Sequence, residues 1–111
     1  MIVYLAGPIT AKDGYTVEQN VESAVAIYFQ LIRAGIPAFC PQLGATMSAV
    51  FDVPYAEWMC YDFKIIDACS HILMLPRWKT SHGANLEHVY ATQQGKIICY
   101  DVKELLTLWL P

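Results

Sequence analysis

The chain has 111 residues, of which 56% are hydrophobic and 15% charged, and its formal net charge is −3. These values predict a single domain over residues 1–111 and exclude intrinsic disorder. The negative charge and the scattered Lys and Arg side chains argue against a nucleic-acid partner. No apolar stretch approaches the length of a membrane span, so we expect no membrane partner.

The cysteines and the first residues bear on the cellular compartment. The four cysteines are far apart in apolar segments, which is typical of reduced core residues, and the first residues predict a strand rather than a secretory leader. We therefore expect a cytoplasmic protein. A metal site from Cys69 and His71 with His82 or His88 lacks the short paired spacings of zinc sites, and we expect neither a metal nor a cofactor.

The N-terminal half of the chain predicts two strands around one long helix. A buried strand is expected at residues 2–6. Residues 16–19 (Thr-Val-Glu-Gln) fit a capping box, and apolar residues at helical spacing then predict a helix that ends near residue 33. A short strand at 38–40 and a loop at 41–54 follow. A loop this long in so small a domain is often functional.

The C-terminal half repeats this alternation and adds a short terminal helix. In chain order we expect a helix at 55–69, a strand at 71–75, a loop at 76–82, a helix at 83–94, a strand at 96–100 and a terminal helix that holds Leu105, Leu106 and Trp109.

Right-handed crossovers would join these elements into a doubly wound α/β fold. We expect a flavodoxin-like or Rossmann-like parallel sheet of four to five strands with helices on both faces, most simply in the order 2-1-3-4. The first and third strands would then be neighbours, and ligands of such folds bind at the carboxyl ends of the strands at this switch point. The loops at 7–9 and 76–83 would line the crevice.

Two carboxylates stand at unusual positions in this arrangement. Asp62 falls near the middle of the apolar arc of the helix at 55–69, where a carboxylate costs several kcal/mol unless it is paired or protonated. Glu87 lies in the first turns of its helix and borders the predicted crevice. An ordinary interpretation remains for each: Asp62 would cap a loop or pair with a cation, and Glu87 would complement the helix dipole.

The start of the helix at 83–94 suits an anion such as phosphate, because its first N–H groups lack intrahelical partners. Ser81, just before this start, would be an N-cap, a phosphate ligand or both. Two carboxyl groups beside an anion site favour glycosidic chemistry. One carboxylate attacks the anomeric carbon, and a second group assists the leaving group.

Three sequence features together resemble the nucleoside 2-deoxyribosyltransferase superfamily. They are residues 4–8 (Tyr-Leu-Ala-Gly-Pro), Asp62 in mid-helix, and residues 81–87 (Ser-His-Gly-Ala-Asn-Leu-Glu). The likeness covers residues 1 to about 100 and implies a single domain of this kind. It also implies cleavage or transfer of the N-glycosidic bond of (2′-deoxy)nucleosides or their 5′-monophosphates, through a covalent glycosyl-Glu intermediate.

The resemblance implies a catalytic role for three residues. Glu87 matches the nucleophile that attacks C1′ of the sugar. Asp62 matches the carboxyl that contacts the base and assists its departure, for which we expect burial to keep it protonated. Tyr4 matches the tyrosine that orients the nucleophile. We expect Tyr4 and Glu87 to line one cavity with the substrate-binding residues.

The substrate-binding residues implied by the same resemblance are Gly7, Ser81 and Gly83. Gly7 sits where the backbone comes close to the sugar or base. Ser81 matches a serine that binds phosphate in 2′-deoxynucleoside 5′-monophosphate N-glycosidases, which favours a nucleotide substrate. Those relatives usually carry an Arg in the loop after the first strand, where this chain offers only Lys12.

Two other classes of function remain open at this point. One is a non-catalytic nucleotide-binding or sensing module with the same fold and pocket, and the other is a structural or partner-binding domain. The match of Tyr4, Asp62 and Glu87 disfavours the last. The low share of charged residues predicts a homodimer or higher homo-oligomer, with the helices after strands 2 and 3 at the contact.

Overall fold

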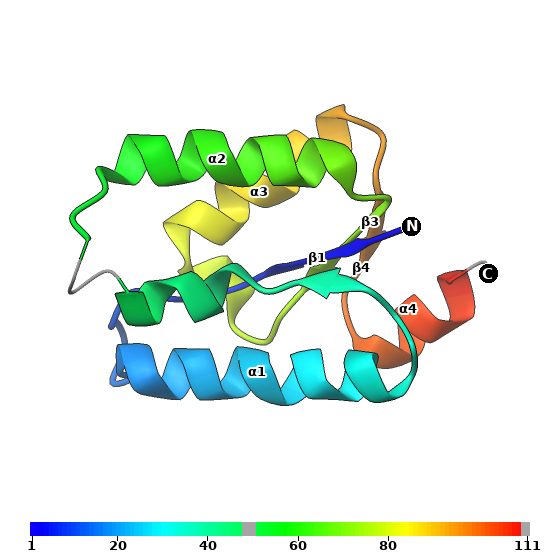
Figure 1. The fold of residues 1–111 in the computed structure, drawn as a ribbon, viewed down its shortest axis with the longest axis horizontal. Helices are drawn as coiled ribbons and strands as arrows, with labels where there is room; N and C mark the ends of the chain where they lie inside the picture. The colour runs from blue at the N-terminus through cyan, green and yellow to red at the C-terminus, as the bar shows by residue number, and fades with distance from the viewer. Residues whose placement is uncertain (48–50, 110–111) are drawn as a thin grey trace.

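A four-stranded parallel sheet forms the centre of the molecule (Figure 1). The computed structural model describes residues 1–47 and 51–109. The strands lie in the order β2-β1-β3-β4, which confirms the predicted α/β fold and strand order. Their bounds are Val3–Ala6 for β1, Ala38–Phe39 for β2, His71–Met74 for β3 and Ile97–Cys99 for β4.

Helices cover both faces of this sheet, as the doubly wound prediction requires. One face packs against α1 (Val17–Arg33) and α4 (Val102–Leu108), and the other against α2 (Tyr55–Ala68) and α3 (His82–Gln93). Side chains of a strand alternate between the two faces. Val3 and Leu5 therefore join the first core, whereas Tyr4 and Ala6 join the second, beneath α2 and α3.

Two helices begin at the predicted caps. Thr16 Oγ1 accepts a hydrogen bond from Gln19 N–H at 3.1 Å, and Gln19 Oε1 accepts one from Thr16 N–H at 2.9 Å, which completes the capping box of α1. Ser81 Oγ accepts a hydrogen bond from Ala84 N–H at 3.1 Å and caps α3. These caps fix the residues at which α1 and α3 begin.

Four details differ from the sequence predictions. The predicted loop at 41–54 contains a 3₁₀ helix, η1 (Pro41–Met47), and its residues 48–50 lie outside the described part of the chain. The terminal helix ends at Leu108, so Trp109 lies beyond it and packs its ring 4.9 Å from that of His71. Cys60 is exposed on α2, whereas the other three cysteines are buried as predicted. A second short 3₁₀ helix, η2 (Trp78–Thr80), precedes α3.

The carboxyl ends of β1 and β3 lie side by side, because Ala6 pairs with Met74. Leu75 N–H donates to the Ala6 carbonyl at 2.8 Å and extends this contact by one residue. A Cβ at Gly7 would stand 2.8 Å from Leu75 Cβ, so only glycine fits here without displacement. The loops that follow the two strands separate at this point and leave room for a cavity.

Candidate active site

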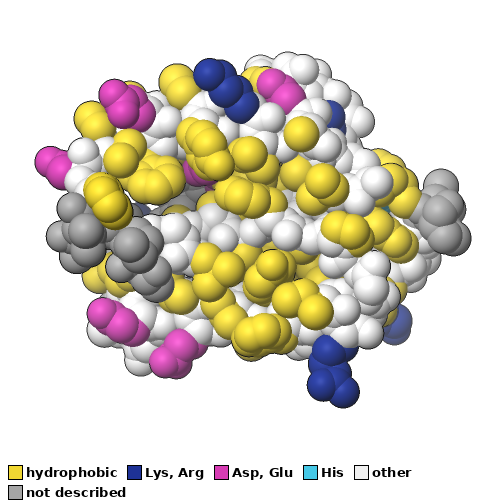
Figure 2. Space-filling view, in the orientation of Figure 1, with side chains coloured by type: hydrophobic (Ala, Val, Ile, Leu, Met, Phe, Trp, Pro, Cys, Tyr) yellow, Lys and Arg dark blue, Asp and Glu magenta, His cyan; other side chains and the backbone are white. Residues whose placement is uncertain are grey.

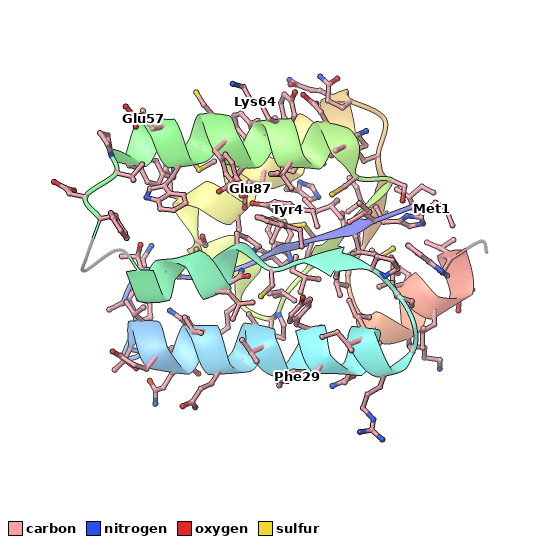
Figure 3. All side chains as sticks on the ribbon, viewed as in Figure 1. Met1, Tyr4, Phe29, Glu57, Lys64 and Glu87 are labelled. Atoms are coloured by element: carbon pink, nitrogen blue, oxygen red, sulfur yellow. The ribbon has the colours of Figure 1, made fainter. Side chains whose placement is uncertain are left out.

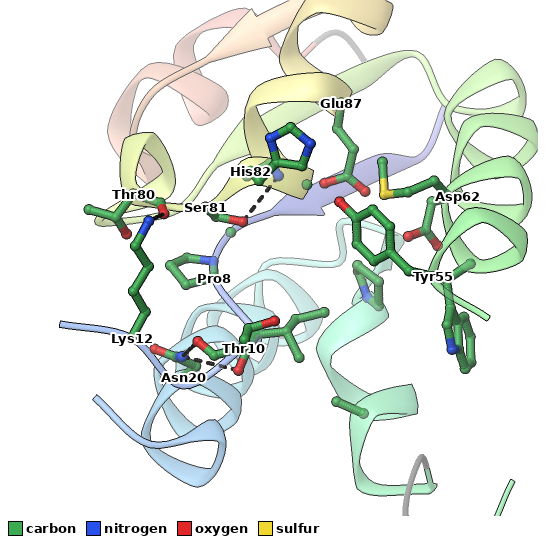
Figure 4. Close-up of a pocket in the computed structure, with 18 of the residues that line it drawn as sticks. Pro8, Thr10, Lys12, Asn20, Tyr55, Asp62, Thr80, Ser81, His82 and Glu87 are labelled. Atoms are coloured by element: carbon green, nitrogen blue, oxygen red, sulfur yellow. Dashed lines mark hydrogen bonds between the residues drawn. The ribbon is translucent and has the colours of Figure 1, made fainter. Parts of the chain in front are cut away.

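A cavity of about 460 Å³ opens at the carboxyl ends of β1 and β3 (Figure 4). Its walls come from the loop after β1, from η1, from the first half of α2 and from the segment that joins η2 to α3. The volume lies in the range of small-molecule sites, and the position is the predicted switch point. Gly7, Asp62, Ser81, Gly83 and Glu87 all line it.

Glu87 reaches the cavity from the second turn of α3 and is only 5% exposed. Tyr4 points toward it from the central strand (Figure 3), and the Tyr4 hydroxyl donates a hydrogen bond to Glu87 Oε2. Burial, followed by the Glu87 charge, raises the pKa of Tyr4 far above its ordinary value, so the phenol stays a donor. This contact fixes one oxygen of the Glu87 carboxyl group.

Tyr4 does not line the cavity, contrary to the expectation. Its side chain is fully buried, because its place on β1 turns it into the core beneath α2 and α3. It can therefore act on a ligand only through Glu87. The other three residues of that expectation, Gly7, Ser81 and Glu87, do share the cavity.

Asp62 faces the same cavity from α2 and is 8% exposed, in agreement with its predicted place on the apolar arc. Burial raises the pKa of Asp62 to about 6, against the opposing effect of hydrogen bonding with Tyr4 and Glu87. Burial raises the pKa of Glu87 further, to about 8, with the Asp62 charge adding to the rise. We call Asp62 and Glu87 the carboxyl pair.

Burial raises the pKa values of both members of the carboxyl pair, so the pair retains a proton near neutral pH that Asp62 and Glu87 share. The direction of the Asp62 shift agrees with the expectation that burial favours its protonated form.

Of the two roles left open for Ser81 by the sequence, the structure shows the N-cap. Its Oγ accepts the capping hydrogen bond from Ala84 N–H, which leaves the hydroxyl proton available to a ligand. Gly83 follows in the first turn, where an added Cβ would stand 3.3 Å from Tyr55 Oη and 3.6 Å from Met59 Sδ. The small residue lets the start of α3 lie close to α2.

Two cationic side chains also line the cavity, away from the carboxyl pair. Lys12 Nζ donates to the Thr80 carbonyl at 3.0 Å. The Arg77 guanidinium lies 3.5 Å above the ring of Tyr15 and donates from Nη2 to Asn20 Oδ1 at 3.0 Å. Sequence reasoning missed Arg77, although it is the only Arg in the loop predicted to line the crevice.

Asn20 links these elements from the first turns of α1. Its side chain is 3% exposed, and its Nδ2 donates to the carbonyls of Ile9 and Thr10 at 3.1 and 3.2 Å. Because its Oδ1 accepts from Arg77, Asn20 joins the loop after β1 to the loop after β3. Asn20 is a second residue that sequence reasoning missed, since its helical position alone gives no sign of these contacts.

Two findings concern metals and membranes. In the described ranges, 1–47 and 51–109, no group of three His, Cys, Asp or Glu side chains is placed to hold a metal ion. No helix of that part of the chain is long and apolar enough to cross a bilayer.

Comparison with known proteins places the chain in a family without assigning it a function. Residues 1–100 match a family model described as "Domain of unknown function (DUF4406)". No curated protein matches the chain.

Proposed function

We propose that this chain, which belongs to the DUF4406 family, cleaves or transfers the N-glycosidic bond of 2′-deoxynucleosides or their 5′-monophosphates. The observation that carries the proposal is the carboxyl pair, buried at a switch-point cavity, with a tyrosine that donates to one member. Two carboxyl groups whose pKa values are pushed apart suit the separate roles of nucleophile and acid. The resemblance of residues 81–87 to nucleoside 2-deoxyribosyltransferases supports the same assignment.

The first step forms a bond to the enzyme and breaks the bond to the base. The proton that the carboxyl pair shares is placed on Asp62, and the Glu87 carboxylate then attacks C1′ of the sugar. The electron pair of the C1′–N bond goes to the base, and Asp62 gives it the proton. Tyr4 stays neutral and keeps its hydrogen bond to Glu87, which holds the nucleophile in place.

The second step releases the sugar. The Asp62 carboxylate takes a proton from water, and the water oxygen attacks C1′ and displaces Glu87. The pair again holds one proton, so the cycle is balanced. A second base in place of water would make the reaction a transfer. No cofactor or metal enters either step.

The cationic end of the cavity favours a 5′-monophosphate over a nucleoside. Ser81 can donate from its hydroxyl at the start of α3, and Lys12 and Arg77 line the same cavity. A phosphate is stabilised by such donors and by the helix N-terminus. The loop after β1 contains no Arg. Arg77, in the loop after β3, supplies a guanidinium in its place.

The direct test is release of free base from a panel of deoxynucleotides, ribonucleotides and nucleosides, followed by chromatography. We expect deoxynucleoside 5′-monophosphates to be cleaved fastest, because the missing 2′-hydroxyl makes the cationic sugar easier to form. Glu87→Ala should abolish release and leave nucleotide binding nearly intact, since the lost interaction acts in the transition state. Undiminished turnover by Glu87→Ala would refute the scheme. Mass spectrometry of an early quench should find a sugar adduct on Glu87.

The alternative is a non-catalytic nucleotide-binding or sensing module, and one observation favours it. Burial raises the pKa of Glu87, which disfavours the ionised carboxylate that a nucleophile requires. Under this alternative the nucleotides bind, but no base appears and no adduct forms. The release assay therefore separates the two functions.

We further propose that the protein is cytoplasmic and forms a homodimer or larger assembly. Hydrophobic side chains gather over α2 and between α2 and α1 on the face in Figure 2. Tyr61 and Phe29 belong to these helices and are about half exposed. An apolar surface of this kind favours self-association. Sedimentation that gives a 12.5 kDa monomer at micromolar concentration would contradict it.

A further inference from the structure

One face of α2 forms a wall of the cavity. Tyr55, Trp58, Met59 and Asp62 recur at the spacing i, i+3, i+4 and i+7, which puts them on the same side of a helix, and all four line the cavity. Glu57 and Lys64 point away from it on the outer side (Figure 3). The wall is therefore apolar and aromatic toward the opening, with one carboxyl group at its inner end.

Tyr55 is the aromatic residue of this wall that remains open to a ligand. Its side chain is 55% exposed although it stands at the cavity mouth, with its ring facing that of His82 at 6.4 Å and 28° (Figure 4). Trp58, by contrast, is half-buried, makes an edge contact with Tyr61 at 6.5 Å and lies against Gly44 of η1.

Tyr55 lies near the carboxyl pair, as Figure 4 shows, and all three residues line the same cavity. Burial, followed by the charges of Glu87 and Asp62, raises the pKa of Tyr55, in agreement with this placement. Its hydroxyl also approaches the start of α3, 3.3 Å from where a Cβ of Gly83 would be. A planar group that rests on Tyr55 would therefore have its edge beside the carboxyl pair.

The charged side chains of the cavity indicate how a bound nucleotide would be oriented. Lys12 lies across the cavity from Tyr55 and Asp62 in Figure 4, beside Thr80 at the end of η2. The phosphate would go to this cationic end, and the base, a flat apolar ring with polar edges, to the aromatic end. The sugar would lie between them, at Glu87.

We infer that Tyr55 is the residue on which the base of the substrate stacks, and that α2 is thereby the wall that selects for a base. The inference rests on the proposed function and extends it to base recognition. Stacking on Tyr55 would hold the base with its edge toward Asp62, the group that gives it a proton. Sequence reasoning did not single out this residue.

The test compares ligands that differ only in the base. Binding of the four 2′-deoxynucleoside 5′-monophosphates and of 2-deoxyribose 5-phosphate is measured by calorimetry in a Glu87→Gln background, which prevents turnover. Adding Tyr55→Ala should weaken nucleotide binding roughly 10- to 100-fold, the range for loss of one base–aromatic stack. Binding of 2-deoxyribose 5-phosphate should change less than about 3-fold, and purines should lose more than pyrimidines because their rings are larger.

Two matched variants separate the ring from other effects. Tyr55→Phe should bind all nucleotides within about 3-fold of the parent, because it keeps the ring. Tyr61→Ala should do the same, because Tyr61 is 50% exposed on the same helix but lies outside the cavity. Equal losses for the nucleotides and for 2-deoxyribose 5-phosphate would overturn the inference, as would a Tyr55→Phe loss as large as that of Tyr55→Ala.

The outcome for the proposed function is read separately, from base release by the wild-type protein. Nucleotide binding that depends on Tyr55 without any base release would refute the proposed catalysis and support the stacking. Base release with no effect of Tyr55→Ala on binding would overturn the stacking alone. Failure of the parent to bind any nucleotide would overturn both.

Discussion

Replacing Glu87 by Gln should stabilise the protein at alkaline pH while it removes activity. The amide resembles the protonated carboxyl group in shape and hydrogen bonding. Its oxygen can still accept from Tyr4, and its NH₂ group supplies a donor on the side of Asp62. What the variant loses is the ability to become charged in a buried site.

The size of the effect follows from the Glu87 pKa. The folded protein binds the Glu87 proton more tightly than the unfolded chain, so stability falls as pH rises from the ordinary value of 4.5 to about 8. One pKa unit corresponds to about 1.4 kcal/mol. For Glu87, which is 5% exposed, the rise from 4.5 to about 8 therefore corresponds to a loss of about 5 kcal/mol in the free energy of unfolding at alkaline pH. Side-chain movement and entry of water relax part of this cost. We expect Gln to recover about 2–3 kcal/mol at pH 9.

Thermal unfolding followed by circular dichroism at pH 5, 7 and 9 provides the measurement. For a domain of this length, 2–3 kcal/mol corresponds to a rise in Tm of roughly 10 °C at pH 9. At pH 5 the two proteins should differ by less than about 1 kcal/mol, because Glu87 is then protonated in the folded state. Glu22→Gln, an exposed position on α1, should unfold like the wild type at every pH.

If wild type and Glu87→Gln lost the same amount of stability between pH 5 and 9, the reasoning would be refuted. Ionisation of Glu87 would then not destabilise the folded protein. A variant that is less stable than wild type at pH 9 would refute it as well. That result would identify Glu87 as a structural residue, since ordinary core residues lose stability when they are replaced.

The remaining predictions concern catalysis, binding and the backbone at the cavity. The kcat/KM of base release should follow a bell-shaped pH profile with limbs near pH 6 and 8. Below the acid limb both carboxyl groups are protonated, and above the alkaline limb neither has a proton to give. A flat profile would contradict this. Ser81→Asn, which keeps an N-cap, should weaken binding of 5′-monophosphates and leave nucleosides unaffected in titration calorimetry. Gly7→Ala should cost about 1–3 kcal/mol in urea unfolding, because the new Cβ meets Leu75; an unchanged midpoint would show that the strand ends can separate.

Most of the fold could be predicted because its elements carry local signals. The strands are short apolar runs bounded by Gly, Pro or polar residues, and the caps at Thr16 and Ser81 mark the helix starts to within a residue. The 3₁₀ helix η1 was missed because such helices have no 3.6-residue pattern. Cys60 was misplaced because apolar neighbours in sequence do not show which side of a helix a residue occupies.

The candidate site was predictable only in part. Asp62 and Glu87 stood out because a carboxylate on an apolar helix face, or beside a predicted crevice, conflicts with its surroundings. Arg77 and Tyr55 gave no such signal, because an Arg in a loop and a Tyr in an apolar helix series do not conflict with their surroundings. The rise of both pKa values in the carboxyl pair depends on how closely α2 and α3 enclose the two groups, which no single element determines.

The central place of β1 has a consequence for synthesis of the chain on the ribosome. This strand is made before the other three strands of the sheet, but it pairs with β3, and its Tyr4 reaches Glu87 on α3. At about 5–20 residues per second, the apolar strand waits roughly 4–14 s before β3 exists. Until then one of its edges has no neighbour, which is when a strand is prone to pair with another chain. Heat or crowding during that interval should reduce the yield of soluble protein more than the same stress applied after release.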